Sequence, residues 1–95
     1  MRIRLITMVH PCSACIMIEG LLREVFEKVS HMEEFAGDIF EVVVLNHPRE
    51  LSSVEGLEVP ELPAVIVGEM QVSAGRLLHR RQLAELIREE KAYEQ

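Results

Sequence analysis

The feature that most constrains the fold is a change in the hydrophobic pattern of the first third of the chain, from a continuous apolar run to apolar residues at helical spacing. Residues 3–9 are apolar or β-branched except for Arg4, and His10–Pro11 end the run, which predicts a buried strand that enters a turn. From Cys12 onward, apolar residues recur at spacings of four and three, which predicts an amphipathic helix of about twenty residues. The inward residues of this helix are Ile18, Leu22, Val25, Val29 and Met32.

Three further segments have the composition of strands. Residues 39–45 form a nearly continuous apolar run, which is typical of a strand buried on both faces. Residues 64–67 begin directly after Pro63, a position where a strand tolerates the missing N–H. Residues 71–74 follow a glycine-containing turn and predict the second strand of a hairpin, which ends at Gly75.

Two more helices complete the predicted order. Pro48 to about Val54 should form a short helix with proline in its first turn, and the pattern is helical again from His79 or Arg80. The order is therefore β-α-β-α-β-β-α, in which the first β-α-β unit requires a parallel strand pair and the hairpin an antiparallel one. We expect one α/β domain over residues 1–95, with a four-stranded mixed sheet flanked by helices.

Composition and charge exclude several classes of function. Sixteen acidic residues against ten Lys and Arg give a formal charge of −6, so a nucleic-acid partner is not expected. No apolar run is long enough to span a bilayer, and the stretch before His10–Pro11 is too short for a signal peptide. Arg80–Arg81 is too short a basic cluster to predict a site. We expect a cytoplasmic monomer that binds no membrane.

Cys12 and Cys15 are the only cysteines. A bond between them would close a loop of about four residues, which stabilises a fold by only roughly 2 kcal/mol, so a structural bridge explains the pair poorly. A secreted disulfide framework would need more cysteines at wider spacing. The pair is therefore either a redox dithiol or half of a metal site.

The predicted position of the pair favours redox chemistry. Cys12 follows the first strand and opens the long helix, where unpaired N–H groups and the positive end of the helix dipole stabilise a thiolate. Cys15 is almost one turn further along, close enough to attack a mixed disulfide formed at Cys12. We therefore expect Cys12 to be the nucleophile and Cys15 the resolving thiol.

These residues give the chain a resemblance to the thioredoxin-like superfamily, in the short form typified by glutaredoxins and small thioredoxins. The resemblance covers nearly the whole chain: the segment from Pro11 to Cys15 opens the long helix, Leu62–Pro63 precedes the third strand, and Gly75 follows the hairpin. It implies a thioredoxin-like fold with a cis proline at Pro63 beside the dithiol.

The resemblance also implies an activity. The protein would be a thiol-disulfide oxidoreductase that acts on protein or small-molecule disulfides and is recharged by an upstream reductase. Leu62, through its backbone, Pro63 and Pro11 would bind substrate, and the only redox group would be the Cys12–Cys15 disulfide, with no separate cofactor and no metal.

Two other functions remain open from the residues alone. The His10 imidazolium would lower the pKa of the Cys12 thiol, or His10 would join Cys12 and Cys15 as a third ligand in a soft-metal (Cu or Zn) binding or carrier protein. Heavy-metal-associated domains end in a strand, however, whereas the last element here is predicted to be a helix. The remaining alternative is a non-catalytic adaptor whose dithiol responds to redox state.

Overall fold

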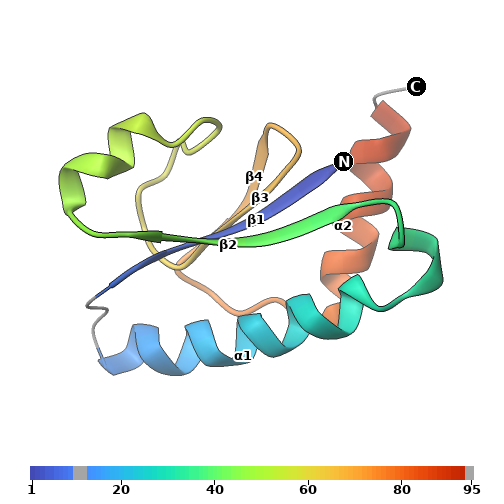
Figure 1. The fold of residues 1–95 in the computed structure, drawn as a ribbon, viewed down its shortest axis with the longest axis horizontal. Helices are drawn as coiled ribbons and strands as arrows, with labels where there is room; N and C mark the ends of the chain where they lie inside the picture. The colour runs from blue at the N-terminus through green and yellow to red at the C-terminus, as the bar shows by residue number, and fades with distance from the viewer. Residues whose placement is uncertain (10–12, 94–95) are drawn as a thin grey trace.

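The computed structural model describes residues 1–9 and 13–93. Within these residues lie four strands, two α-helices and two short 3₁₀ helices (Figure 1). They are β1 (Arg2–Met8), α1 (Ser13–Ser30), η1 (Glu33–Phe35), β2 (Ile39–Leu45), η2 (Pro48–Ser53), β3 (Ala64–Val67), β4 (Met70–Ala74) and α2 (Arg80–Tyr93). The strands form one mixed sheet, so the predicted α/β class with a four-stranded mixed sheet is confirmed.

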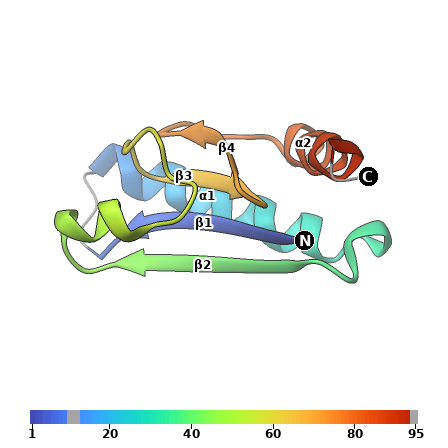
Figure 2. The same ribbon diagram turned by 90° about the horizontal axis from the view of Figure 1, so that it is seen from above.

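The strand order in the sheet is β2-β1-β3-β4 (Figure 2). β1 is parallel to β2 and antiparallel to β3, and β4 returns antiparallel to β3. Since β1 and β3 run in opposite directions, the start of β3 lies beside the end of β1, with Ile6 opposite Ala64. This pairing brings the segment before β3 close to the point where the chain leaves β1 for α1.

Both α-helices pack on the same face of the sheet. Leu22, Phe26 and Val29 of α1 and Leu83 and Ile87 of α2 are buried in one core with the sheet. The predicted periodicity of α1 is thus confirmed, because its inward face keeps apolar side chains away from water. No helix within the described ranges is long and apolar enough to cross a membrane.

The opposite face of the sheet is covered by η2 and the loop that follows it, where we predicted an α-helix. This prediction is wrong, because residues 48–53 form a 3₁₀ helix. The hydroxyls of Ser52 and Ser53 donate to the carbonyl oxygens of Arg49 and Glu50, and these serine bonds compete with continued helical hydrogen bonding. Leu51, Val54, Leu57 and Leu62 cover the small core on this face.

β2 differs from its prediction in burial. It is an edge strand, and Ile39 is 61% and Val44 45% exposed, so it is not buried on both faces. Its apolar run resembles that of the central strand β3, whose four residues are all buried. An apolar run alone does not distinguish a central strand from an edge strand, because strand order is set by long-range pairing.

Candidate active site

The candidate site lies where β1 ends and α1 begins. The N–H of Val9 donates to the carbonyl oxygen of Leu45 at 2.9 Å and extends the β1–β2 pairing by one residue beyond Met8. The predicted nucleophile Cys12, the predicted modulator His10 and the predicted loop residue Pro11 lie outside the described residues. The structure therefore describes the site from the side of Cys15 and of the segment before β3.

Cys15 is the third residue of α1, and its side chain is half-buried. Its sulfur belongs to a disulfide bond. The Sγ atom lies 3.6 Å from the carbonyl oxygen of Leu62, although 47 positions separate the two residues in the chain. In the disulfide state this is a close contact without a donated hydrogen, whereas after reduction the Cys15 thiol can donate to this oxygen. One predicted redox residue therefore touches the predicted substrate-binding segment.

The Leu62–Pro63 peptide bond is cis, as the resemblance implied, and Pro63 is buried. The carbonyl oxygen of Pro63 accepts a hydrogen bond from the N–H of Gly75 at 2.8 Å. Gly75 has φ +68°, and a Cβ atom there would lie 3.4 Å from Oε2 of Glu61. The turn after β4 thus needs a glycine, and its N–H fixes the segment that contacts Cys15.

The start of α1 is electrostatically suited to an anionic sulfur. No acidic residue occupies the first turn of this helix. The nearest carboxylate along α1, that of Glu19, is paired with the Arg23 guanidinium at 2.8 Å. The positive end of the helix dipole is therefore not neutralised by an acid on its own first turn, and it stabilises a thiolate relative to a thiol.

Sequence reasoning did not single out the apolar surface beside Cys15. Ile16 is 56% and Met17 71% exposed, although both are apolar and follow Cys15 directly. The signal was present, because the inward stripe of this helix passes through Ile18 and Leu22 and leaves positions 16 and 17 outside it. Exposed apolar side chains of this kind can pack against a bound polypeptide.

The titratable groups with shifted pKa values lie at the other end of the sheet. Burial opposes ionisation of Asp38, but hydrogen bonds from Lys91 and the N-terminal ammonium hold the pKa of Asp38 below its ordinary value. The hydrogen bond from Arg88 lowers the pKa of Glu34 in the same region. Neither carboxylate is near Cys15, so these two groups belong to the structure of the fold.

Within residues 1–9 and 13–93, no group of three His, Cys, Asp or Glu side chains is arranged to hold a metal ion. Of the three metal ligands considered above, His10, Cys12 and Cys15, only Cys15 lies in these described ranges. The chain matches no family model, no curated protein and no solved structure. The interpretation of the site therefore depends on its residues and their geometry.

Proposed function

We propose that this protein is a thiol-disulfide oxidoreductase with a thioredoxin-like arrangement. The observation that carries the proposal is the 3.6 Å contact between Cys15 Sγ and the carbonyl oxygen of Leu62. It brings a cysteine at the positive end of a long helix into contact with the segment that precedes β3, where a substrate backbone could lie beside the sulfur. The half-burial of Cys15 suits a resolving thiol, which attacks within the protein and not a substrate in solution.

The thioredoxin-like part of the proposal has support from the order of elements. A parallel β1-α1-β2 unit is followed by the antiparallel β3–β4 hairpin and then by α2. Leu62–Pro63 stands before β3 and Gly75 after β4, at the positions that the resemblance assigns to them. The 3₁₀ helix η2 takes the place of the second helix in this arrangement.

In the first step of the proposed reaction, the Cys12 thiolate attacks one sulfur of a substrate disulfide. A bond forms between Cys12 and that sulfur, the substrate S–S bond breaks, and the second substrate sulfur leaves as a thiolate that takes a proton from solvent. The segment at Leu62 and Pro63 would hold the substrate backbone during this attack. The exposed side chains of Ile16 and Met17 would contact apolar substrate residues.

In the second step, Cys15 loses its proton to solvent and attacks the Cys12 sulfur of the mixed disulfide. The Cys12–Cys15 disulfide forms, the mixed disulfide bond breaks, and the remaining substrate sulfur leaves as a thiolate that takes a proton from solvent. Two electrons pass from the dithiol to the substrate, and an upstream dithiol reductase would return them. Before this step, the Cys15 thiol would donate a hydrogen bond to the Leu62 carbonyl oxygen, which would hold the sulfur in place. A reducing cytoplasm would keep the resting protein in the dithiol state.

Insulin-disulfide reduction with dithiothreitol tests this proposal. We expect the wild type to accelerate the reaction and both Cys12→Ser and Cys15→Ser to fall to the background rate. Ser13→Ala is the matched control, because Ser13 is exposed and lies between the cysteines without a proposed chemical role. Cys15→Ser should accumulate a mixed disulfide with insulin, detectable by mass spectrometry, and Cys12→Ser should not.

Other outcomes separate the competing functions. Background rates for all variants and for the wild type would contradict the oxidoreductase proposal and favour an adaptor. Tight one-to-one binding of Zn(II) or Cu(I) by the reduced protein, lost in His10→Ala and accompanied by no reductase activity, would identify a metal carrier instead.

A further inference from the structure

Residues of α1 and α2 line a cavity that lies away from Cys15. This cavity of about 550 Å³ is lined by residues of both helices and by Met32, and four of its lining side chains are cationic, those of Lys28, Arg80, Arg81 and Arg88. Lys28 is more than three helical turns beyond Cys15 on α1, about 20 Å along the helix axis. This site therefore takes no part in the proposed thiol chemistry.

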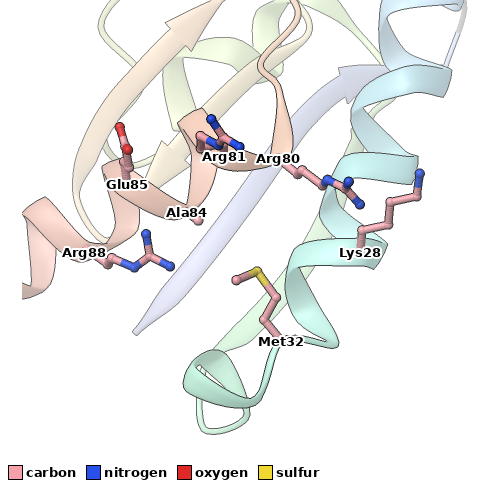
Figure 3. A pocket seen from close by; sticks show the side chains of 7 residues that line it. All are labelled: Lys28, Met32, Arg80, Arg81, Ala84, Glu85 and Arg88. Carbon is pink, nitrogen blue, oxygen red and sulfur yellow. The ribbon is translucent and has the colours of Figure 1, made fainter.

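Four of the side chains that line this cavity lie around one space, those of Lys28, Met32, Arg80 and Arg88. Figure 3 shows Arg80 extending toward Lys28, and Met32 and Arg88 pointing into the space between the helices. The carboxylate of Glu85, the one acidic residue of the lining, points away from this space (Figure 3). The cavity thus combines a cationic wall with the apolar side chains of Met32 and Ala84.

Three of these four cations make no ion pair with another described residue. All ten Lys and Arg residues of the chain lie in the described ranges, and five of them make neither an ion pair nor a side-chain hydrogen bond there. Three of these five, Lys28, Arg80 and Arg81, line the same cavity. The other two are Arg49 and Arg76. Three of the five cations without a partner in the described ranges are therefore gathered at this cavity.

Local partners were available but are not used. Glu24 lies four residues before Lys28 on α1, and Glu85 lies four residues after Arg81 on α2, a spacing at which helical ion pairs form. Neither of these two pairs is made. The ion pairs that the two helices do make among the described residues are Arg23–Glu19, Arg88–Glu34 and Lys91–Asp38. The first turn of α2 also contains no acidic residue, so its arginines stand at the positive end of a helix dipole, where cations are unfavourable. A bound anion would relieve both effects.

We propose that the cavity binds a small organic phosphate that carries two or more negative charges. Arginine forks match the oxygen geometry of phosphate, and the α2 N-terminus adds backbone dipoles that favour it. Met32 and Ala84 would contact the apolar or aromatic body of the ligand, and the cavity volume is in the range of small-molecule sites.

The surroundings favour a small anion over an acidic protein surface. Glu24, Glu27 and His31 line a depression next to the cavity together with Lys28 and Arg80. The two glutamates would repel an extended acidic partner, and the overall charge of −6 would do so at longer range. A compact anion that enters only the cavity would avoid this repulsion.

Titration calorimetry and ¹⁵N NMR at low ionic strength test the proposal, with inorganic pyrophosphate and ADP as probes. We expect one-to-one saturation with both, and shifts confined to amides around Lys28 and the start of α2. Removing each arginine should weaken binding about tenfold, so the double variant Arg80→Gln/Arg81→Gln should lose about a hundredfold. Met32→Ser should weaken ADP binding and leave pyrophosphate binding unchanged.

The double variant Arg49→Gln/Arg76→Gln is the matched control, because it removes the same charge from the unpaired cations outside the cavity. It should change the Kd of either probe by less than about threefold. Equal weakening in the two double variants, or shifts spread over the whole surface, would overturn the proposal. So would a glutamate-rich peptide that binds the same residues more tightly than both phosphates. If Arg80→Gln/Arg81→Gln does not fold, Lys28→Gln on α1 replaces it, with the single variant Arg49→Gln as the control of equal charge.

Discussion

Asp38 provides a sharp test of the packing between the start of the sheet and α2. Its carboxylate accepts hydrogen bonds from Lys91 at 2.5 Å and from the N-terminal ammonium at 3.1 Å, and the Asp38 side chain is only 5% exposed. Glu34 is tied to the same helix by Arg88, but both of these side chains are more than 40% exposed. Both carboxylates thus pair with a cation of α2, but Asp38 is buried and has the N-terminal ammonium as a second partner, whereas Glu34 is exposed and has only Arg88.

Asp38→Asn should lower the free energy of unfolding by about 2 kcal/mol. Removing one partner of a buried ion pair costs about 3 to 5 kcal/mol, and the cost is smaller here because the Lys91 side chain is 34% exposed and can regain solvent. With a urea m-value of about 1.5 kcal/mol/M, the unfolding midpoint should fall by about 1 M. Glu34→Gln, the matched control, should keep a midpoint close to that of the wild type.

The lowered pKa of Asp38 sets the sign of the pH dependence of stability. The pKa of Asp38 is below its ordinary value of 3.8, so the stability from its ionised form is present above pH 3.8 and is lost as the pH falls through the lower folded-state pKa. The difference in stability between the wild type and Asp38→Asn should therefore be constant from pH 7 to about pH 4 and shrink below that.

Urea denaturation followed by circular dichroism at several pH values measures both effects. Equal midpoint shifts for Asp38→Asn and Glu34→Gln at pH 7 would refute the argument from burial. A constant difference between the wild type and Asp38→Asn down to pH 2 would show that the Asp38 carboxylate is not preferentially ionised in the folded state.

Two further predictions concern single residues. Gly75→Ala should destabilise the protein by about 1 to 2 kcal/mol because φ is positive at that position. Gly20→Ala should stabilise it by about 0.5 to 1 kcal/mol, because Gly20 is exposed on α1 and no atom lies near the added Cβ. Thermal unfolding measures both effects, and the same sign for the two variants would contradict this prediction. Gln71 makes three hydrogen bonds with the backbone of Glu58 and Val59. Gln71→Ala should therefore lower the free energy of unfolding by about 1 to 2 kcal/mol and accelerate amide hydrogen exchange at Glu58 and Val59. Unchanged exchange at these two amides would show that other contacts hold the loop.

The sequence by itself predicted the four strands and the two long helices, but not the two 3₁₀ helices. The strands at residues 39–45 and 64–67 have the predicted bounds, and α2 starts at Arg80 as expected. These features depend on hydrophobic period, proline and glycine, which act over a few residues and are therefore visible in one dimension. The position of Cys15 near the start of a long helix was predictable for the same reason.

Only the tertiary structure decided which of these elements are neighbours. The exposure of Val44 in β2, the contact of Cys15 with Leu62 and the convergence of Lys28 with Arg80 all depend on strand order and helix packing. The sequence Arg80–Arg81 alone did not predict a site. The third cation of the cavity without a partner among the described residues, Lys28, is on another helix and more than fifty positions away in the chain. Such contacts arise from the burial of apolar faces across the whole chain, and no local pattern encodes them.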